Sequence, residues 1–202
     1  MKPLPRLYAI ADASFGDPVQ LAQNLFDGGA RLVQVRNKKG STRELLEQVD
    51  RILSFAPGDA RLIVNDRTDV ALIARAGGVH LGQEDLPSAK ARQILGPELM
   101  IGISTHNFRQ ALEAEKLPVD YVAVGPIFST TSKENPDPVI GLESLAEICR
   151  AIRKPVVAIG GIKLQNVVEV LQAGASSVAV IRDLLDAPDI ASRLQRWIEA
   201  LN

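Results

Sequence analysis

The sequence has 202 residues, a formal net charge of −1 and a pI of about 6.2. This charge balance argues against a nucleic-acid-binding protein, which would usually carry a strongly basic surface. Hydrophobic residues make up 46% and charged residues 23% of the chain, as in ordinary globular proteins, and no apolar run approaches the roughly 18 residues of a membrane helix. We therefore expect a soluble protein without membrane association.

The only cysteine is Cys149, which excludes a disulfide within the chain and favours a reducing compartment. The residues after Met1 lack the apolar segment of a secretion signal. We therefore expect a cytoplasmic protein.

Short runs rich in Val, Ile and Leu alternate with amphipathic stretches along the chain. The predicted strands are Arg6–Asp12, Arg31–Asn37, Arg61–Asp66, Gly78–Gly82, Met100–Ser104, Asp120–Ile127, Pro155–Gly160 and Ser177–Arg182. The predicted helices are Val19–Asp27, Glu44–Phe55, Val70–Ala76, Ala89–Leu95, Phe108–Lys116, Leu142–Ile152, Leu164–Ala173 and Ile190–Leu201. Ser41 and Asn107 stand where helix N-caps are expected. Such continuous β-branched runs are typical of a parallel sheet covered by helices.

A closed barrel and an open doubly wound sheet both fit this alternation. Successive strand centres are about 24 residues apart, and eight such units favour a small single-domain (β/α)₈ barrel over residues 1–202. No GxGxxG motif follows the first strand, so the best signature of a dinucleotide-binding sheet is missing.

In a barrel of this type the chemistry takes place at the carboxyl ends of the strands. The second strand ends with Gln34, Arg36 and Lys38, which alternation places on one face. The two cations are suited to a phosphate or pyrophosphate, although a solvated loop explains them equally well.

The third and fourth strands end in acidic residues that neighbouring strands would bring together. Asn65 and Asp66 end the third strand, and Asp85 follows the fourth. A carboxylate after a buried run is costly unless it is paired or binds a metal, and Mg²⁺ typically takes one or two carboxylates together with substrate phosphate. The alternative is that Asp66 caps a helix and Asp85 is a loop residue.

Hydroxyl groups and glycines follow the later strands. Ser104 ends the fifth strand, and Ser129–Lys133 forms a hydroxyl-rich loop after the sixth that could act as a lid. Gly160–Gly161 after the seventh strand, near the end of the eighth at Arg182, matches a common barrel phosphate site. Two anion sites on one barrel mouth suggest two phosphorylated substrates.

Read together, these segments resemble the thiamine-phosphate synthase family. The matching runs are Gln34–Lys38 (QVRNK), Asn65–Arg67 (NDR), His80–Asp85 (HLGQED), Gly102–Ser104 (GIS), Gly125–Lys133 (GPIFSTTSK) and Ile159–Ile162 (IGGI). They occur in order over essentially the whole chain. The resemblance implies a transferase that joins hydroxymethylpyrimidine pyrophosphate to hydroxyethylthiazole phosphate, or its carboxylated form, by a dissociative displacement that releases pyrophosphate.

The resemblance also implies roles for individual residues. Asp66 and Asp85 would hold Mg²⁺. The pyrophosphate would be bound, and its departure assisted, by Arg36, Lys38, Ser104 and Lys133, together with Asn65 as a binding residue. Gln34 would contact the pyrimidine, whereas Thr130, Ser132 and Gly161 would bind the thiazole phosphate. Arg182 stands where the family often has a Ser beside that phosphate, so its contacts would differ.

Other functions stay open at this point. A thiazole tautomerase on the same barrel is associated with a His in the position of His106, and a regulator could bind thiazole phosphate without turnover. The presence of Asp85 favours the synthase. His80 is interpreted as a structural strand-end residue, and the sequence leaves homo-oligomer formation open.

Overall fold

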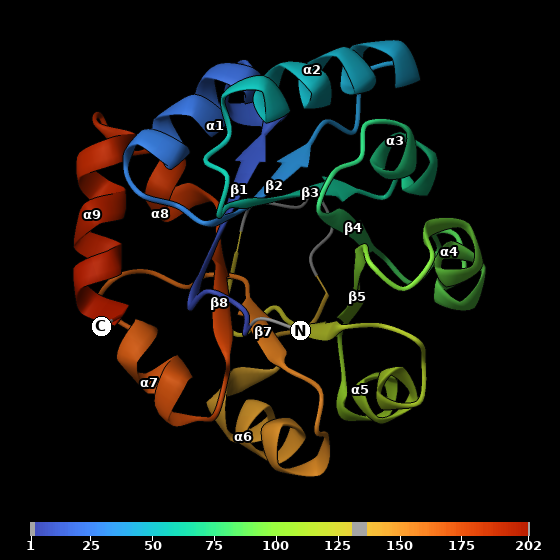
Figure 1. The fold of residues 1–202 in the computed structure, drawn as a ribbon. Helices are drawn as coiled ribbons and strands as arrows, with labels where there is room; N and C mark the ends of the chain where they lie inside the picture. The colour runs from blue at the N-terminus through green and yellow to red at the C-terminus, as the bar shows by residue number, and fades with distance from the viewer. Residues whose placement is uncertain (1–2, 131–136, 202) are drawn as a thin grey trace.

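The structure, a computed structural model, describes residues 3–130 and 137–201. Its eight strands are β1 (Leu7–Asp12), β2 (Leu32–Arg36), β3 (Arg61–Asn65), β4 (Gly78–Leu81), β5 (Met100–Thr105), β6 (Tyr121–Val124), β7 (Val156–Ile159) and β8 (Ser177–Val180). All neighbours pair in parallel, and β8 pairs with β1 to close the barrel. Figure 1 shows the helices forming a ring around these strands. The predicted (β/α)₈ barrel is confirmed.

The helices of the described residues are α1 (Pro18–Asp27), α2 (Thr42–Phe55), α3 (Thr68–Ile73), α4 (Ser88–Leu95), α5 (Phe108–Glu115), α6 (Gly141–Ala151), α7 (Val167–Gln172), α8 (Arg182–Leu185) and α9 (Ile190–Leu201). A short 3₁₀ helix, η1 (Ala13–Phe15), follows β1. The Ser41 and Asn107 side chains cap α2 and α5 as predicted. Within the described ranges, every helix is too short or too polar to cross a bilayer.

The element limits correct some predicted bounds. Arg182 was predicted to end the last strand, but it begins α8, a helix that sequence periodicity did not indicate. The sixth strand was predicted to run to Ile127 but ends at Val124, before Gly125–Pro126. The apolar run of the sixth strand continues into its loop because Pro126 and Ile127 are also buried.

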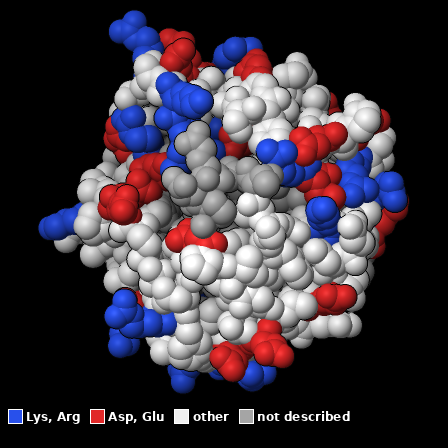
Figure 2. Space-filling model, turned by 180° about the vertical axis from the view of Figure 1, so that it is seen from behind, with Lys and Arg blue, Asp and Glu red and all other residues white. Residues whose placement is uncertain are grey.

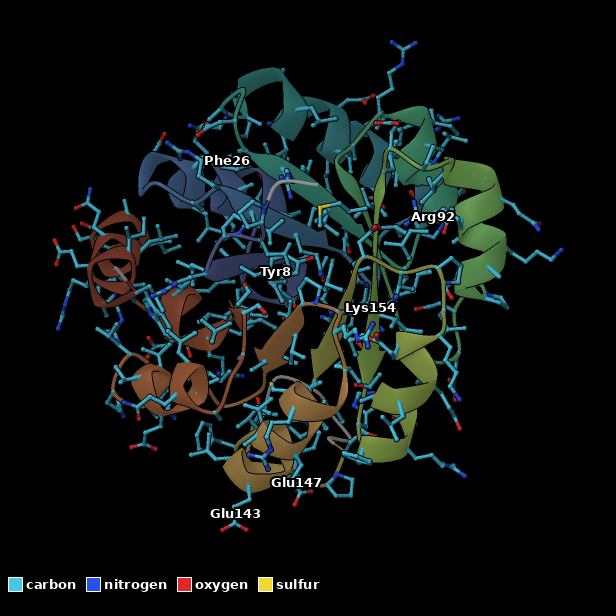
Figure 3. The ribbon with its side chains drawn as sticks, turned by 60° about the horizontal axis from the view of Figure 1, so that its bottom comes forward. Tyr8, Phe26, Arg92, Glu143, Glu147 and Lys154 are labelled. Atoms are coloured by element: carbon cyan, nitrogen blue, oxygen red, sulfur yellow. The ribbon has the colours of Figure 1, made fainter. Side chains whose placement is uncertain are left out.

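Alternation along the strands separates two apolar cores. One lies between the strands and the helices and includes Phe26, whereas the other fills the barrel interior and includes Tyr8. Figure 3 shows Tyr8 inside the ring of strands and Phe26 outside it, towards α1. The barrel interior is therefore a packed core, not a channel.

One glycine decides how the interior is filled. Gly102 pairs with His80 on β4 and with Tyr121 on β6. A Cβ atom at Gly102 would lie 2.0 Å from Tyr121 Cζ. The missing side chain lets the Tyr121 ring cross β5 and stack on His80, with ring centroids 5.6 Å apart.

We predict that Gly102→Ala lowers the free energy of unfolding by about 1–3 kcal/mol, because the new methyl group overpacks a buried ring. Urea unfolding measures this change. Gly58→Ala is the matched control, since nothing lies within 4 Å of a Cβ built there. Equal stability of both variants would contradict this account of the interior.

Candidate active site

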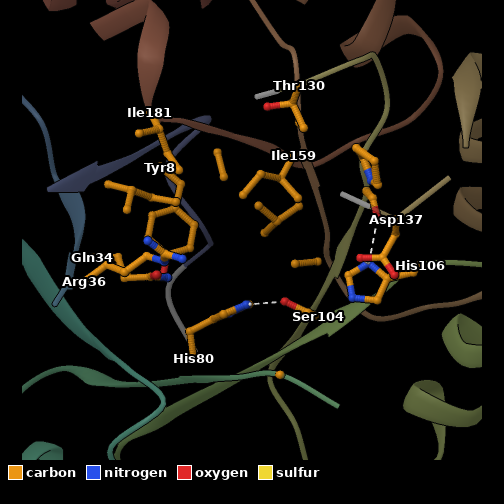
Figure 4. A pocket seen from close by; sticks show the side chains of 18 of the residues that line it. Tyr8, Gln34, Arg36, His80, Ser104, His106, Thr130, Asp137, Ile159 and Ile181 are labelled. Carbon is orange, nitrogen blue, oxygen red and sulfur yellow. Dashed lines mark hydrogen bonds and ion pairs between the residues drawn. The ribbon is translucent and has the colours of Figure 1, made fainter. Parts of the chain in front are cut away.

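A cavity of about 1070 Å³ opens at the carboxyl end of the barrel. The residues predicted from sequence that line it are Gln34, Arg36, Lys38, Asn65, Asp66, Asp85, Ser104, Thr130, Gly161 and Arg182. They come from different strands and loops, and closure of the barrel brings them together. Ser132 and Lys133 lie outside the described residues. Figure 4 shows how the side chains of Gln34, Arg36, Ser104 and Thr130 surround this space.

The end of β2 presents its polar residues on one face, as the alternation predicted. Gln34 Nε2 donates a hydrogen bond to Tyr8 Oη at 2.8 Å. Arg36 Nη1 donates to the buried Asp12 carboxylate, and Lys38 Nζ lies 3.4 Å from Asp66 Oδ2. The Arg36 side chain is only 18% exposed, unlike a residue of a solvated loop, whereas the Lys38 side chain is 58% exposed, as that alternative predicts.

Asp12 does not line the cavity but contacts Arg36, which does, and the sequence did not indicate this role. Its other carboxylate oxygen accepts hydrogen bonds from the Ser14 backbone N–H at 2.9 Å and from the Ser14 hydroxyl at 2.8 Å. Asp12 thus holds the Arg36 guanidinium at the edge of the cavity. The signal available was its position alone, because Asp12 ends a buried apolar run just as Asp66 does.

Asp66 and Asp85 form the acidic part of the site. Burial raises the pKa of Asp66, the nearby Asp85 carboxylate raises it further, and the Lys38 ammonium offsets only part of this effect. Asp85 Oδ2 accepts a hydrogen bond from the Gly82 backbone N–H at 2.6 Å, which fixes the loop after β4. Two carboxylates in one half-buried place have the oxygen donors that a hard cation requires.

The alternative role of Asp66 as a helix cap is wrong. Arg67 is the N-cap residue of α3, and no side chain makes a cap hydrogen bond there. Asp66 has a φ of 62°, and its backbone N–H donates to His80 O at 2.8 Å. In the described residues no three His, Cys, Asp or Glu side chains are grouped as a metal site. The acidic site is therefore a pair that needs ligand oxygens to complete a coordination shell.

The loops after β6 and β7 meet at the opposite side of the cavity. Gly160 and Gly161 have φ values of 98° and 66°, and a Cβ on Gly161 would lie 2.5 Å from Ser129 O. Phe128 N–H donates to Gly160 O at 3.0 Å. Only glycine fits this close backbone approach, which leaves the turn after β7 open to the cavity.

Arg182 is fixed at the rim of the cavity by neighbours from two segments. Its guanidinium lies 5.1 Å from the Phe15 ring centroid, and Nη1 lies 3.3 Å from Asp186 Oδ2. The adjacent Asp183 carboxylate is bound by Arg193 at 2.8 Å and by the Trp197 indole N–H at 2.7 Å. Trp197 is thus both a buried packing residue and an anchor for α8.

The two histidines both line the cavity but have different partners. His106 Nδ1 donates to Gly125 O at 2.8 Å and lies 3.4 Å from Asp137 Oδ2. His80 contacts Tyr121 and Ser104 through its two ring nitrogens. Figure 4 marks the His106–Asp137 and His80–Ser104 contacts with dashed lines. His80 is therefore part of the site wall as well as a strand-end residue.

Comparison with known proteins identifies the family. The family model described as "Thiamine monophosphate synthase" matches residues 7–184. The chain belongs to this family. It is 50% identical to the thiamine-phosphate synthase of Koribacter versatilis, over 92% of this chain and 91% of that one. It is 47% identical to the thiamine-phosphate synthase of Anaeromyxobacter dehalogenans, over 96% and 88% of the two chains.

A solved family structure has the same fold. Thiamine phosphate pyrophosphorylase from Pyrococcus furiosus superposes with a TM-score of 0.89 and 38% identity, over 97% of this chain and 95% of that chain. The 3-hexulose-6-phosphate synthase structure, at 17% identity and a TM-score of 0.72, shares the fold alone. The family resemblance read from the sequence motifs is confirmed, and so is the classification of the chain as a transferase of this family.

We predict that Asp66→Asn stabilises the metal-free protein by a few tenths of a kcal/mol at neutral pH. Because the pKa of Asp66 is raised in the folded protein, its ionised form lowers the free energy of unfolding. This destabilisation develops as the pH rises from the ordinary carboxyl pKa through the raised pKa of Asp66. Asn also tolerates the left-handed φ of this position. Urea unfolding in EDTA measures the gain.

Added Mg²⁺ should then stabilise the wild type more than Asp66→Asn. Asp59→Asn, at an exposed carboxylate paired with Arg31, is the control and should give no stabilisation in EDTA. A destabilised Asp66→Asn in EDTA would show that the Lys38 contact outweighs the repulsion from Asp85.

Proposed function

We propose that this chain is a thiamine-phosphate synthase that condenses hydroxymethylpyrimidine pyrophosphate with hydroxyethylthiazole phosphate, or its carboxylated form, and releases pyrophosphate. One observation carries the proposal: in a chain that belongs to this family, the described residues predicted for both substrates line one cavity. The proposal includes a cytoplasmic location and one domain over residues 1–202.

The pyrophosphate subsite is proposed at the ends of β2 to β5. Arg36, held by Asp12, presents guanidinium N–H groups, and Lys38 supplies a second positive charge. Ser104 and Asn65 add neutral polar groups from the neighbouring strands. Such an array stabilises the negative charge that develops on a departing pyrophosphate, which is the main task in a dissociative displacement. Lys133 is proposed to contribute from outside the described residues.

Mg²⁺ is the proposed cofactor, because the Asp66–Asp85 pair supplies two oxygen ligands and the substrate can supply phosphate oxygens. When bound, it would neutralise charge on the leaving group. Asp85 is held in place by its hydrogen bond from Gly82, so that one ligand is oriented before the substrate arrives.

The thiazole phosphate subsite is proposed at the turn after β7. The close packing of Gly161 against Ser129 exposes backbone that can approach a phosphate. Thr130 lines the same space and Ser132 is proposed to join it, while Gln34, across the cavity, is proposed to contact the pyrimidine. The two substrates would then meet between these subsites, and no protein nucleophile is required.

The first experiment measures thiamine phosphate formed from the two substrates with Mg²⁺ and with EDTA. We expect Mg²⁺-dependent product, and a loss on the order of 100-fold or more in Asp66→Ala and Asp85→Ala. Asp59→Ala, which removes an exposed carboxylate paired with Arg31, should retain full activity.

Two other outcomes would replace the proposal. Isomerisation of the thiazole carboxylate phosphate without synthesis, lost in His106→Ala, would identify a tautomerase. Binding of thiazole phosphate by folded protein without either reaction would identify a regulator.

Arg182 is proposed to bind the thiazole phosphate in place of the usual Ser. We predict that Arg182→Ala raises the KM for thiazole phosphate by roughly tenfold and changes kcat little, because a charge-assisted contact to a bound substrate is lost. Arg196→Ala on the exposed face of α9 is the matched control. An unchanged KM in Arg182→Ala would remove Arg182 from the subsite.

A further inference from the structure

Five side chains form a continuous chain of hydrogen bonds across the interior of the barrel. The successive contacts are Gln34 Nε2 to Tyr8 Oη (2.8 Å), Tyr8 Oη to Tyr121 Oη (3.0 Å), Tyr121 Oη to His80 Nδ1 (3.0 Å) and His80 Nε2 to Ser104 Oγ (2.9 Å). Both ends line the cavity. The middle of this chain is buried, and neither tyrosine has a role in the proposed reaction so far.

The hydrogen bonds in this chain have one consistent direction. Tyr8 accepts from Gln34, so the single hydroxyl hydrogen of Tyr8 is directed to Tyr121 Oη. The Tyr121 hydrogen is then directed to His80 Nδ1, which must be the nitrogen without a hydrogen. His80 therefore carries its hydrogen on Nε2 and donates to Ser104 Oγ.

The opposite direction is costly. If Tyr121 donated to Tyr8, the buried Tyr8 hydroxyl would have no acceptor for its hydrogen, because its other neighbour is the Gln34 amide N–H. Burial raises the pKa of both tyrosines well above the ordinary value, so both hydroxyls keep their hydrogens. Each hydrogen bond in this series is therefore donated in the direction from Gln34 towards Ser104.

This direction determines what each end offers to a ligand. Ser104 Oγ accepts from His80, so its own hydrogen is available to an acceptor in the cavity. At the other end, the Gln34 amide nitrogen is used by Tyr8. Among the described residues, Thr68 Oγ1 is the only buried side-chain oxygen or nitrogen without a hydrogen-bond partner. Gln34 Oε1 has no partner among the hydrogen bonds of the described residues and is not one of these buried atoms, so it must be accessible. Because Gln34 lines the cavity, this oxygen is open to the cavity as an acceptor.

We propose that Tyr8, Tyr121 and His80 are positioning residues that hold Ser104 as a hydrogen-bond donor to an anionic oxygen and Gln34 as an acceptor for an amino group. The assignment of these groups to the pyrophosphate and the heterocycle of one substrate rests on the proposed function. The predicted tautomer of His80 does not rest on the proposed function, because it follows from hydrogen bonds within the protein. Figure 4 shows His80 and Ser104 on one side of the cavity and Tyr8 with Gln34 on another.

The test is the ¹⁵N NMR spectrum of the histidine ring nitrogens in the full chain, at a pH at which free histidine is neutral. The sequence has two histidines, and His106→Gln assigns their signals. We expect His80 to be the Nε2–H tautomer. His106 provides an internal contrast, since its bond to Gly125 O requires Nδ1–H.

The decisive variant is Tyr8→Phe, which lies two hydrogen bonds away from His80. Without the Tyr8 hydrogen, Tyr121 is free to accept from His80 Nδ1, so both tautomers of His80 should appear. Tyr121→Phe removes the partner of Nδ1 directly and should have the same effect, which covers the case that Tyr8→Phe does not fold. Thr105→Val, which deletes a buried hydroxyl bonded to Ala123 O at 2.9 Å, should leave the tautomer unchanged.

Kinetics test the consequence for the ligand. Tyr8→Phe and Tyr121→Phe should lower kcat/KM for the pyrimidine pyrophosphate roughly three- to tenfold, as expected for one disordered hydrogen bond, and leave the KM for thiazole phosphate unchanged. An Nδ1–H tautomer in the wild type, or a wild-type spectrum in Tyr8→Phe, would overturn the proposal even if synthase activity is present. An inactive protein with the expected tautomers would instead contradict the proposed function.

Discussion

The alternation of side chains along eight closed strands is the constraint on which the site depends. In a closed barrel, every second residue of each strand points into a narrow interior, where polar groups must find partners among themselves. Tyr8, Gln34, His80 and Tyr121 occupy such positions and satisfy one another. Gly102 makes this arrangement feasible, because a side chain there would occupy the place of the Tyr121 ring.

The polar groups nearer to the cavity are held in the same way, each by a partner that does not itself need to touch a substrate. Asp12 orients Arg36, the Gly82 N–H orients Asp85, and Arg193 with Trp197 anchors the start of α8 through Asp183. On the face shown in Figure 2, basic and acidic side chains are interspersed. The positive charge that faces the cavity is therefore a local arrangement on a nearly neutral chain.

The sequence was sufficient for the barrel because eight similar units carry the same pattern of apolar runs and amphipathic helices. It also indicated most of the cavity, because polar residues such as Asp66 and Ser104 stand directly at the ends of those runs. It did not reveal the Tyr8–Tyr121 contact, whose residues are 113 positions apart and look like ordinary core aromatics. Asp12 could not be assigned a role for another reason: its ion pair with Arg36 joins β1 to β2, and the distance of 24 positions along the chain does not indicate it.

The pairing of β1 with β8 has a consequence for how the protein is made. Leu7 lies opposite Val178, and the Arg6 guanidinium donates to Leu201 O at 2.7 Å, so the seam of the barrel joins segments that are far apart in the sequence. During synthesis one edge of β1 remains without its partner strand until β8 has left the ribosome. Exposed strand edges pair readily with other chains. The nascent chain is therefore prone to aggregation through this edge until β8 emerges, and a premature stop before β8 would leave the edge open permanently.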